Sequence, residues 1–348
     1  MVRETAVVVC PGRGTYNRAE LGYLRRYHAD KTAFMDRIDR YRRQFEQPSI
    51  AELDTMSRYS MDVHNVGENV SALIYACALC DITDIDADRF EIVAVTGNSM
   101  GWYLALAAAK VLDEAGAIQV VNTMGSMMKD DIIGVQIVYP VVDSEWQIDP
   151  DATATVQRVL NEVNENGQGR VYLSINLGGT YVLGADERGA QSLMRKLPPK
   201  DGRYPLRLPN HAAFHTPLLD EVARKAQQVL SKSIFHVPRI PAIDGRGHIW
   251  QPYSTDLDAL YAYTLDYQVR FTYDFSKAME VAFKEFAPDR IIVPGPGYTL
   301  GASIAQELIK HQWLGIRAKD NFLSIQDKDP FVLCMGMEEQ RQRVVKCH

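Results

Sequence analysis

The sequence predicts an α/β protein with a mainly parallel sheet and a smaller α+β unit inserted into it. Short apolar runs rich in β-branched residues recur between helical segments, and three of these runs end in glycine-rich turns. A middle stretch alternates strand-like and helical patterns of its own. The chain has 348 residues, 46% of them hydrophobic, which is enough for one large core and a smaller second core.

The first part of the chain contains two strands that lead into tight turns. The apolar run TAVVVC stops at Pro11 and Gly12, as a buried strand that delivers a glycine-rich loop would. Residues 18–45 combine spaced apolar positions with many arginines, which predicts solvated helices. The run FEIVAVTG then leads directly into the small apolar residues of WYLALAAAKVL, so a strand, a tight turn and a buried helix are expected.

Residues 132–207 are predicted to form the inserted unit. The strand-like runs GVQIVYPVV, RVYLSINL and TYVLGA alternate there with the helical runs ATVQRVLNEVN and ERGAQSLMRKL. The order β-α-β-β-α-β predicts a small ferredoxin-like domain, which leaves 1–131 and 208–348 for the large domain. The strand DRIIVPGPG near the end again stops at glycines. Because the carboxyl ends of parallel strands share one edge of a sheet, a ligand is expected where these loops meet.

Composition argues against several classes of function. A net charge of −6 disfavours binding to nucleic acid or to anionic membranes. No apolar stretch reaches the roughly 20 residues of a membrane helix, and the N-terminus meets glycine too soon for a signal peptide, so a cytoplasmic location is expected. Five scattered cysteines favour reduced thiols, and Cys77 and Cys80 lack the second ligand pair of a zinc site. No metal is therefore expected, and because neither a dinucleotide fingerprint nor a P-loop occurs, no bound cofactor is expected either.

The clearest chemical motif is Gly97-Asn98-Ser99-Met100-Gly101, which matches G-x-S-x-G. A strand enters the motif and a buried helix leaves it, which is the context of a nucleophile elbow that exposes a serine hydroxyl. The glycines permit the tight turn, and the helix N-terminus lends positive potential to an oxyanion beside Ser99. The alternative is a serine that only caps the helix.

A serine hydroxyl needs a base to become a good nucleophile. Among eight histidines, His215 lies in a loop before a helix, where a long connection could return to the edge of the sheet. His211 fits equally well by spacing, and so does a surface histidine without a catalytic role.

Four motifs in order resemble the signature of malonyl-CoA:acyl carrier protein transacylases and of the acyltransferase domains of polyketide synthases. Their order and spacing agree from about Ala6 to Leu308, with the small domain included. The resemblance implies an α/β hydrolase-like large domain, an active site between the two domains, and His215 as the base. The motifs are Pro11-Gly12-Arg13-Gly14, Gly97-Asn98-Ser99-Met100-Gly101, Phe214-His215-Thr216-Pro217 and Gly295-Pro296-Gly297.

The family chemistry implied by this resemblance is acyl transfer in two half-reactions. Ser99 would attack the thioester of an acyl-CoA, His215 would act as general base and then protonate the leaving thiol, and the thiol of an acyl carrier protein would take the acyl group. The backbone N–H groups of Met100 and Arg13 would form the oxyanion hole. Coenzyme A or a phosphopantetheine arm would be a substrate.

The resemblance also implies what surrounds the catalytic pair. In the family a backbone carbonyl near the Gly-Pro-Gly turn orients the histidine, which here indicates the loop at Val293, Pro294 and Gly295. The residues expected to border the acyl pocket are Asn98, Met124, Asn176 and Phe214.

One departure from the family bears on the acyl group. Malonyl-selective members hold the substrate carboxylate with an arginine in a pattern like R-G-x-x-M, and the matching stretch here is Met124-Gly125-Ser126-Met127-Met128. Arginine grips a carboxylate with two charged hydrogen bonds, whereas methionine offers an apolar wall. An unpaired buried carboxylate would cost roughly several kcal/mol. We therefore expect an uncharged acyl group such as acetyl or longer, unless another arginine substitutes.

Two further departures lie beside the nucleophile. Arg13 stands where the family usually has glutamine, and Asn98 stands where it usually has histidine. The Arg13 guanidinium could reach a substrate carboxylate, the phosphates of CoA, or a neighbouring acid, and the sequence leaves this open.

Two other functions fit the same motifs. If water reached the Ser99 ester, the protein would be a hydrolase that removes acyl groups from carrier proteins. A non-catalytic module that binds carrier proteins is the third reading, although it needs neither Ser99 nor His215. Acyl carrier proteins are acidic, so docking needs local basic clusters, each of which also fits a solvated surface without a partner. The candidates are Arg195, Lys196, Lys200, Arg203 and Arg207, and Arg25, Arg26, Arg42 and Arg43.

Overall fold

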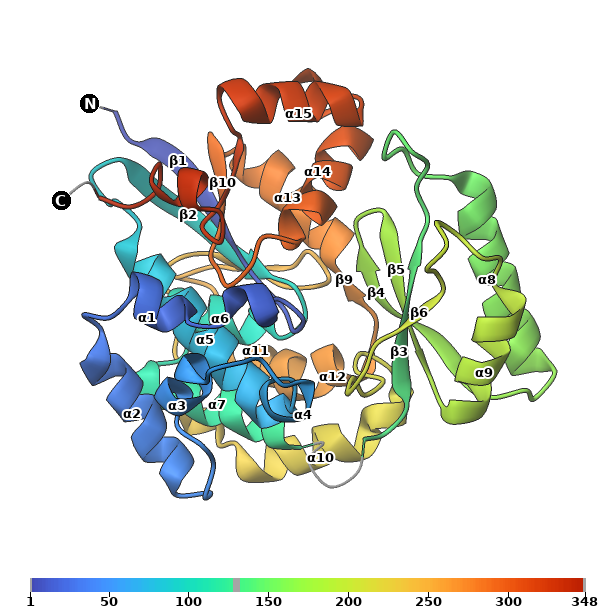
Figure 1. Ribbon diagram of the computed structural model, residues 1–348, viewed down its shortest axis with the longest axis horizontal. Helices are drawn as coiled ribbons and strands as arrows, with labels where there is room; N and C mark the ends of the chain where they lie inside the picture. Colours follow the sequence, from blue (N-terminus) through green and yellow to red (C-terminus); the bar gives the residue numbers. More distant parts are fainter. Residues whose placement is uncertain (1, 128–131, 347–348) are drawn as a thin grey trace.

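The main sheet forms the centre of the molecule. The computed structural model describes residues 2–127 and 132–346 (Figure 1). The strand order is β11-β10-β1-β2-β7-β8, with every neighbouring pair parallel except β7 and β8. The strands are β1 (Glu4–Cys10), β2 (Phe90–Gly97), β7 (Ala242–Ile243), β8 (Ile249–Trp250), β10 (Arg290–Val293) and β11 (Val332–Cys334).

Helices cover both faces of this sheet. In Figure 1, α5, α6 and α7 lie on one side of β1 and β2, and α13 and α14 lie on the other. The last five residues of β1 are all buried, as expected for a central parallel strand. Small side chains such as those of Ala105 and Ala107 let α6 pack closely on the sheet. The bounds of these helices are α5 (Gly67–Asp84), α6 (Gly101–Ala108), α7 (Glu114–Ser126), α13 (Phe275–Phe286) and α14 (Leu300–Lys310).

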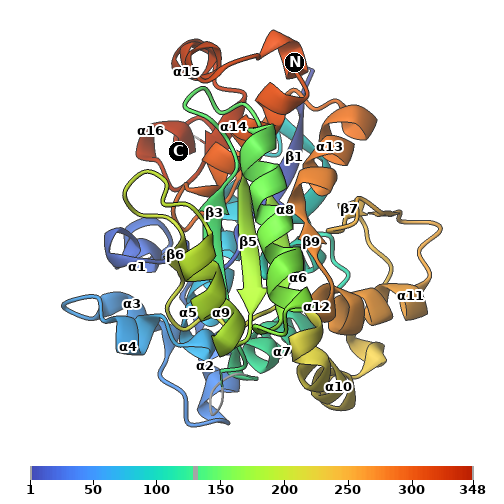
Figure 2. The same cartoon turned by 90° about the vertical axis from the view of Figure 1, so that its right-hand side faces the viewer.

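A second sheet, in the order β6-β3-β5-β4-β9, lies beside the main body. Helices α8 (Pro150–Glu165) and α9 (Glu187–Lys196) cover one face of it (Figure 2), and it has its own apolar core. The predicted order β-α-β-β-α-β is observed between residues 135 and 207; that 132–207 is a separate domain stays a prediction. The strands are β3 (Val135–Pro140), β4 (Val171–Leu177), β5 (Thr180–Ala185), β6 (Leu206–Arg207) and β9 (Tyr273–Asp274).

The remaining helices surround these two sheets. Residues 18–45 form the predicted helices, and α11 continues through a π-helical turn, Tyr263–Tyr267, into α12. None of the helices in the described parts of the chain has the length and apolarity to cross a membrane. The bounds are α1 (Tyr23–Tyr27), α2 (Thr32–Arg43), α3 (Ile50–Thr55), α4 (Met61–His64), α10 (Asp220–Val229), α11 (Leu257–Ala262), α12 (Gln268–Arg270), α15 (Lys319–Lys328) and α16 (Glu338–Arg341).

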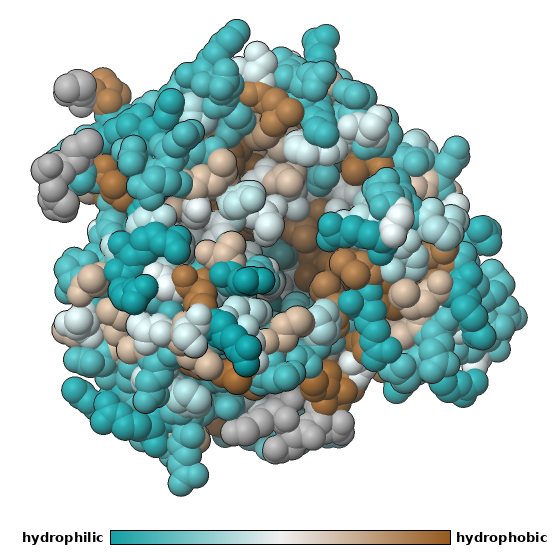
Figure 3. Space-filling model, in the orientation of Figure 1, coloured by the Kyte–Doolittle hydropathy of each residue, from teal (hydrophilic) through white to brown (hydrophobic). Residues whose placement is uncertain are grey.

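The glycine-rich loops leave the main sheet at one edge. Strands β1, β2 and β10 are parallel neighbours and end at Cys10, Gly97 and Val293, so the loops that follow them emerge together. The surface is hollowed between the main body and the second sheet, with apolar residues beside the hollow (Figure 3). The thiols of Cys10, Cys77, Cys80 and Cys334 are free, and Cys347 lies outside the described residues.

Candidate active site

Ser99 sits in a strained turn between β2 and α6. Its φ of +56° lies in the left-handed region, which non-glycine residues rarely adopt. A Cβ atom added to Gly97 would lie 2.3 Å from the backbone of Gly101, and one added to Gly101 would lie 2.3 Å from the carbonyl oxygen of Cys10. Both glycines are therefore required by close packing, and they hold the serine in the geometry of a nucleophile elbow.

The structure brings Ser99 and His215 together. Ser99 Oγ lies 2.7 Å from His215 Nε2, and the histidine is buried. Burial lowers the pKa of His215 to about 4, although a hydrogen bond from its ring to the Gln268 carbonyl opposes this shift. The imidazole is thus neutral at neutral pH and can accept the serine proton. His211 does not reach Ser99: its Nδ1 lies 3.2 Å from Gln136 Oε1.

The end of α12 orients the histidine. His215 Nδ1 donates to the carbonyl oxygen of Gln268 at 2.5 Å, and the His215 backbone N–H donates to that of Val269 at 2.8 Å. Helix α12 ends at Arg270, so these carbonyls have no partner within the helix. The negative potential at a helix C-terminus would also favour a protonated imidazole at this position.

The prediction that the loop at Val293, Pro294 and Gly295 orients His215 is therefore wrong. The Val293 carbonyl accepts the Met335 N–H at 2.8 Å, and the Gly295 N–H donates to Asp81 Oδ2 at 2.6 Å. The loop is thus tied to a buried polar cluster around Asp81 of α5. The histidine loop packs on α12 instead, and α12 supplies the carbonyl.

A cavity of about 40 Å³ opens on the catalytic pair. Met100, Met124 and Phe214 line it, as the sequence predicted for the latter two, and so do Arg13 and Tyr103. Since one water needs roughly 10–15 Å³ of such space, the cavity has room for a few water-sized groups. Only a small group fits beside Ser99 in this cavity.

Two residues predicted for the acyl pocket lie outside the lining of this cavity. The backbone N–H of Asn98 donates to Cys10 O at 3.1 Å, and its buried side chain packs against Gly12. Asn176 Nδ2 donates to Asp274 Oδ1 at 2.9 Å and so links β4 to the start of α13. Met128, the last residue of the stretch that replaces R-G-x-x-M, lies outside the described residues.

The N-terminus of α6 offers a free donor beside Ser99. Met100 is the N-cap residue of α6, and its side chain provides no capping hydrogen bond. The Gly101 N–H donates to the Asn98 carbonyl, whereas the Met100 N–H has no acceptor within residues 2–127 and 132–346. A free N–H at this position suits an oxyanion. The backbone role of Arg13 as the second donor stays a prediction.

The Arg13 side chain lines the cavity without an acidic partner. Its Nη2 donates to the carbonyl oxygens of Asn210 at 3.0 Å and Asn65 at 3.4 Å, and its Nε is buried without a hydrogen bond. No carboxylate pairs with it in the part of the chain that the structure describes. Burial lowers the pKa of Arg13 to about 10, so it stays charged at neutral pH. A neighbouring acid, which the sequence leaves open as a partner of Arg13, is not found among residues 2–127 and 132–346.

Sequence reasoning missed three residues that support the nucleophile. Gln268 Nε2 donates to the Ser99 carbonyl at 3.1 Å and its Oε1 accepts from Tyr103 OH at 3.1 Å. Tyr273 OH donates to the Gly97 carbonyl at 2.6 Å. Only Tyr103 carried a signal, since it lies in the first turn of the helix that follows the Ser99 turn.

The basic clusters differ in exposure. Arg195 and Arg203 are exposed, and so are Arg25, Arg26 and Arg43. Arg42 is fully buried, so its assignment to an exposed basic cluster is wrong. Its guanidinium donates hydrogen bonds to buried backbone carbonyl and side-chain amide oxygens. Its partners are Pro48 O, Glu68 O, Asn69 Oδ1 and Asn122 Oδ1.

Comparisons with known proteins agree with the resemblance drawn from the motifs. No family model matches the chain. In sequence, the chain is similar to the malonyl CoA-acyl carrier protein transacylase of Escherichia coli (strain K12), with 27% identity over 153 residues, 43% of this chain. The match spans 46% of that protein, so the chain aligns with about half the length of this relative.

The fold agrees over nearly the whole chain. The malonyl-CoA:acyl carrier protein transacylase of Xanthomonas oryzae pv. oryzae superimposes with a TM-score of 0.73 at 18% identity, covering 99% of this chain and 100% of that chain. A malonyl-transacylase solved in complex with a type II polyketide synthase acyl-carrier protein gives a TM-score of 0.68 at 18% identity. The match covers 88% of this chain and 93% of that chain. The predicted fold class and the resemblance to transacylases are confirmed.

Proposed function

We propose that this chain transfers a short acyl group from an acyl-CoA or acyl-carrier thioester to an acyl carrier protein through an ester on Ser99. The observation that carries the proposal is the 2.7 Å contact between Ser99 Oγ and His215 Nε2, at a strained strand–helix turn that faces a cavity. A serine that only capped the helix would not need a buried, neutral histidine at hydrogen-bond distance.

The residues support both half-reactions. As Ser99 Oγ attacks the thioester carbon, His215 Nε2 takes its proton, and the free N–H of Met100 stabilises the oxyanion. The carbon–sulfur bond then breaks, and the leaving thiolate takes the proton from His215. In the second half-reaction, the carrier-protein thiol gives its proton to His215 and attacks the ester carbon. The bond from that carbon to Ser99 Oγ then breaks, and Oγ regains a proton from His215.

A carrier protein as acceptor is supported by similarity and by surface charge. A similar fold was solved with a type II polyketide synthase acyl-carrier protein bound to it. The exposed Arg195 and Arg203 offer positive charge on the second sheet's side of the molecule, which suits an acidic partner. Fatty-acid or polyketide-type synthesis is the setting that such a transfer serves.

The acyl group is limited by size and by the walls of the cavity. The wall of the cavity formed by α7 is apolar, because the buried side chain of Met124 lies there. Considered by itself, this wall favours an uncharged acyl group. Arg13 lines the same cavity from the glycine-rich loop after β1. Whether the acyl group carries a charge therefore depends on Arg13 as well as on Met124.

A pulse–chase experiment tests the proposal. The protein is mixed with an acyl-CoA, followed by intact-protein mass spectrometry, and then chased with buffer or with a holo acyl carrier protein. We expect a mass increment equal to one acyl group, stable in buffer and moved to the carrier protein. An increment that decays in buffer at the same rate with or without carrier protein identifies a hydrolase. An increment that Ser99→Ala also forms contradicts the mechanism.

A further inference from the structure

The peptide bond that leads into His215 is held from two sides. Its carbonyl oxygen, on Phe214, accepts a hydrogen bond from Ser174 Oγ at 2.8 Å, and its N–H donates to the Val269 carbonyl at 2.8 Å. His215 has a φ of +61°, in the left-handed region that non-glycine residues rarely adopt. A residue keeps such a strained conformation only where its surroundings hold it there. Ser174 and the residues at the end of α12 supply this restraint from opposite sides of one planar group.

Ser174 reaches the histidine loop from an irregular point of the second sheet. The pairing of β4 with β5 shifts between Leu173 and Ile175, so Ser174 is the extra residue of a β-bulge, and its side chain is fully buried. Bulges of this kind re-aim a side chain. A Cβ atom added to Gly184 of β5 would lie 2.5 Å from Thr216 Cγ2 and 3.4 Å from Ser174 Cβ. The histidine loop therefore packs directly on this part of the sheet.

A chain of hydrogen bonds sets the direction of the Ser174 hydroxyl. A carbonyl oxygen can only accept, so Ser174 Oγ donates to Phe214 O and accepts from Gln136 Nε2 of β3, which lies 2.8 Å away. Gln136 Oε1 then faces His211 Nδ1 at 3.2 Å and needs a donor there. Burial and the charge of Arg13 lower the pKa of His211 to about 3, so its ring is neutral at neutral pH. The contact with Gln136 places the one ring proton on Nδ1.

We propose that Ser174 is a positioning residue for the catalytic base: it orients the peptide that leads into His215, and Gln136 and His211 hold its hydroxyl in the required direction. The proposal rests on the chemistry of Ser99 and His215 proposed above and adds the second sheet to it. A displacement of β4 would turn the imidazole away from Ser99. His211, which by spacing fits the base as well as His215 does, acts on the site only through Gln136 and Ser174.

The first test compares two buried serines of the same part of the fold. Ser192 Oγ of α9 donates to the carbonyl oxygens of Gln168 and Arg188 at 3.1 and 3.0 Å, so Ser174→Ala and Ser192→Ala each remove one buried hydroxyl that donates to the backbone. Intact-protein mass spectrometry follows the rate at which a small alkyl fluorophosphonate modifies Ser99. We expect this rate to fall at least about tenfold in Ser174→Ala, as the loss of one hydrogen bond predicts, and to change less than about twofold in Ser192→Ala. Equal rates in the two variants overturn the proposal.

A second test needs no reaction at Ser99. In protein with isotope-labelled histidine, NMR detects the Nδ1 proton of His215, which donates to the end of α12, and the signal is assigned by its absence from His215→Gln. We expect this signal to be sharp in the wild type and in Ser192→Ala, and to shift or broaden in Ser174→Ala and Gln136→Leu. An identical signal in all these proteins overturns the positioning role. If the signal changes as expected while Ser99 of the wild type stays unreactive, the proposed function fails and the positioning role stands.

Discussion

At the scale of single residues, the site depends on a histidine that is neutral because it is buried. His215 has no acidic partner on its Nδ1; a carbonyl oxygen at the end of α12 accepts that proton instead. A carbonyl fixes the tautomer as well as a carboxylate does, but it adds less charge stabilisation to the imidazolium. Burial therefore dominates, and the pKa of His215 falls to about 4.

This pKa predicts the pH dependence of acylation. The base works only when neutral, so activity is lost as pH falls through the pKa of the folded protein. We expect kcat/KM for acylation by acetyl-CoA to stay constant from pH 8 to about pH 5 and to halve near pH 4. Circular dichroism at each pH verifies that the protein remains folded. A midpoint near pH 6.5 would show that His215 is as solvated as a free histidine.

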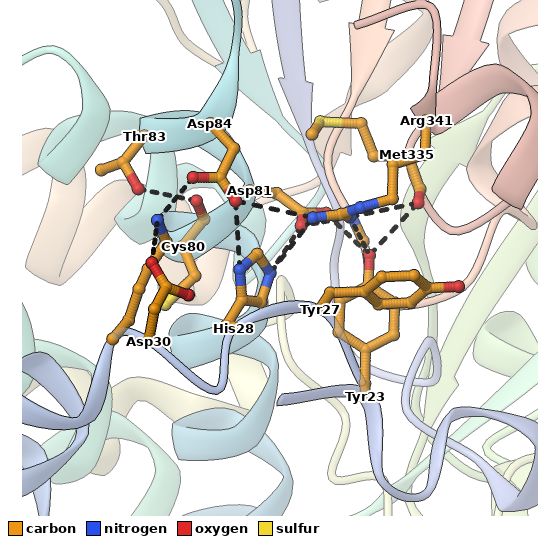
Figure 4. A network of polar contacts seen from close by, with 12 residues as sticks. Tyr23, Tyr27, His28, Asp30, Cys80, Asp81, Thr83, Asp84, Met335 and Arg341 are labelled. Atoms are coloured by element: carbon orange, nitrogen blue, oxygen red, sulfur yellow. Dashed lines mark hydrogen bonds and ion pairs between the residues drawn. The ribbon is translucent and has the colours of Figure 1, made fainter. Parts of the chain in front are cut away.

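At the scale of elements, a buried polar cluster ties the C-terminal helix to the rest of the fold. Arg341 of α16 pairs with Asp81 of α5 at 2.6 Å, and His28, after α1, contacts the same carboxylate at 2.8 Å (Figure 4). Asp81 also accepts from Tyr23 OH at 2.8 Å and from the Gly295 N–H. One buried carboxylate therefore joins α1, α5, α16 and the loop after β10.

Removing the cation of this cluster is expected to be costly. Arg341→Ala removes the guanidinium from the buried Asp81 and leaves it with His28 and two neutral donors, and breaking a buried ion pair costs roughly 3–5 kcal/mol. Urea unfolding should show a loss of free energy of unfolding of about that size. The neighbouring exposed Arg343→Ala serves as control and should change it by about 0.5 kcal/mol or less. A loss below about 1 kcal/mol for Arg341→Ala would mean that the cluster holds α16 only weakly.

At the scale of the whole molecule, the sequence predicts those features that are determined by residues close together in the chain. The strand ends at Cys10 and Gly97 and the elbow at Ser99 depend on neighbours in the chain, because glycine spacing and apolar runs act locally. The carbonyl of Gln268 could not be predicted, since it reaches His215 only after α12 packs on the histidine loop, 53 residues away. The surroundings of Arg13 likewise depend on contacts made by folding.

The most direct measurement of the central claim locates the acyl group on the chain. After brief incubation with an acyl-CoA, the protein is digested and the acylated peptide is sequenced by mass spectrometry. The account predicts a single acylated residue, Ser99, and a modified fraction that falls by at least about a hundredfold in His215→Ala, because the base contributes roughly 10²–10⁴ in rate. Acylation of any other residue, or an unchanged yield in His215→Ala, would contradict it.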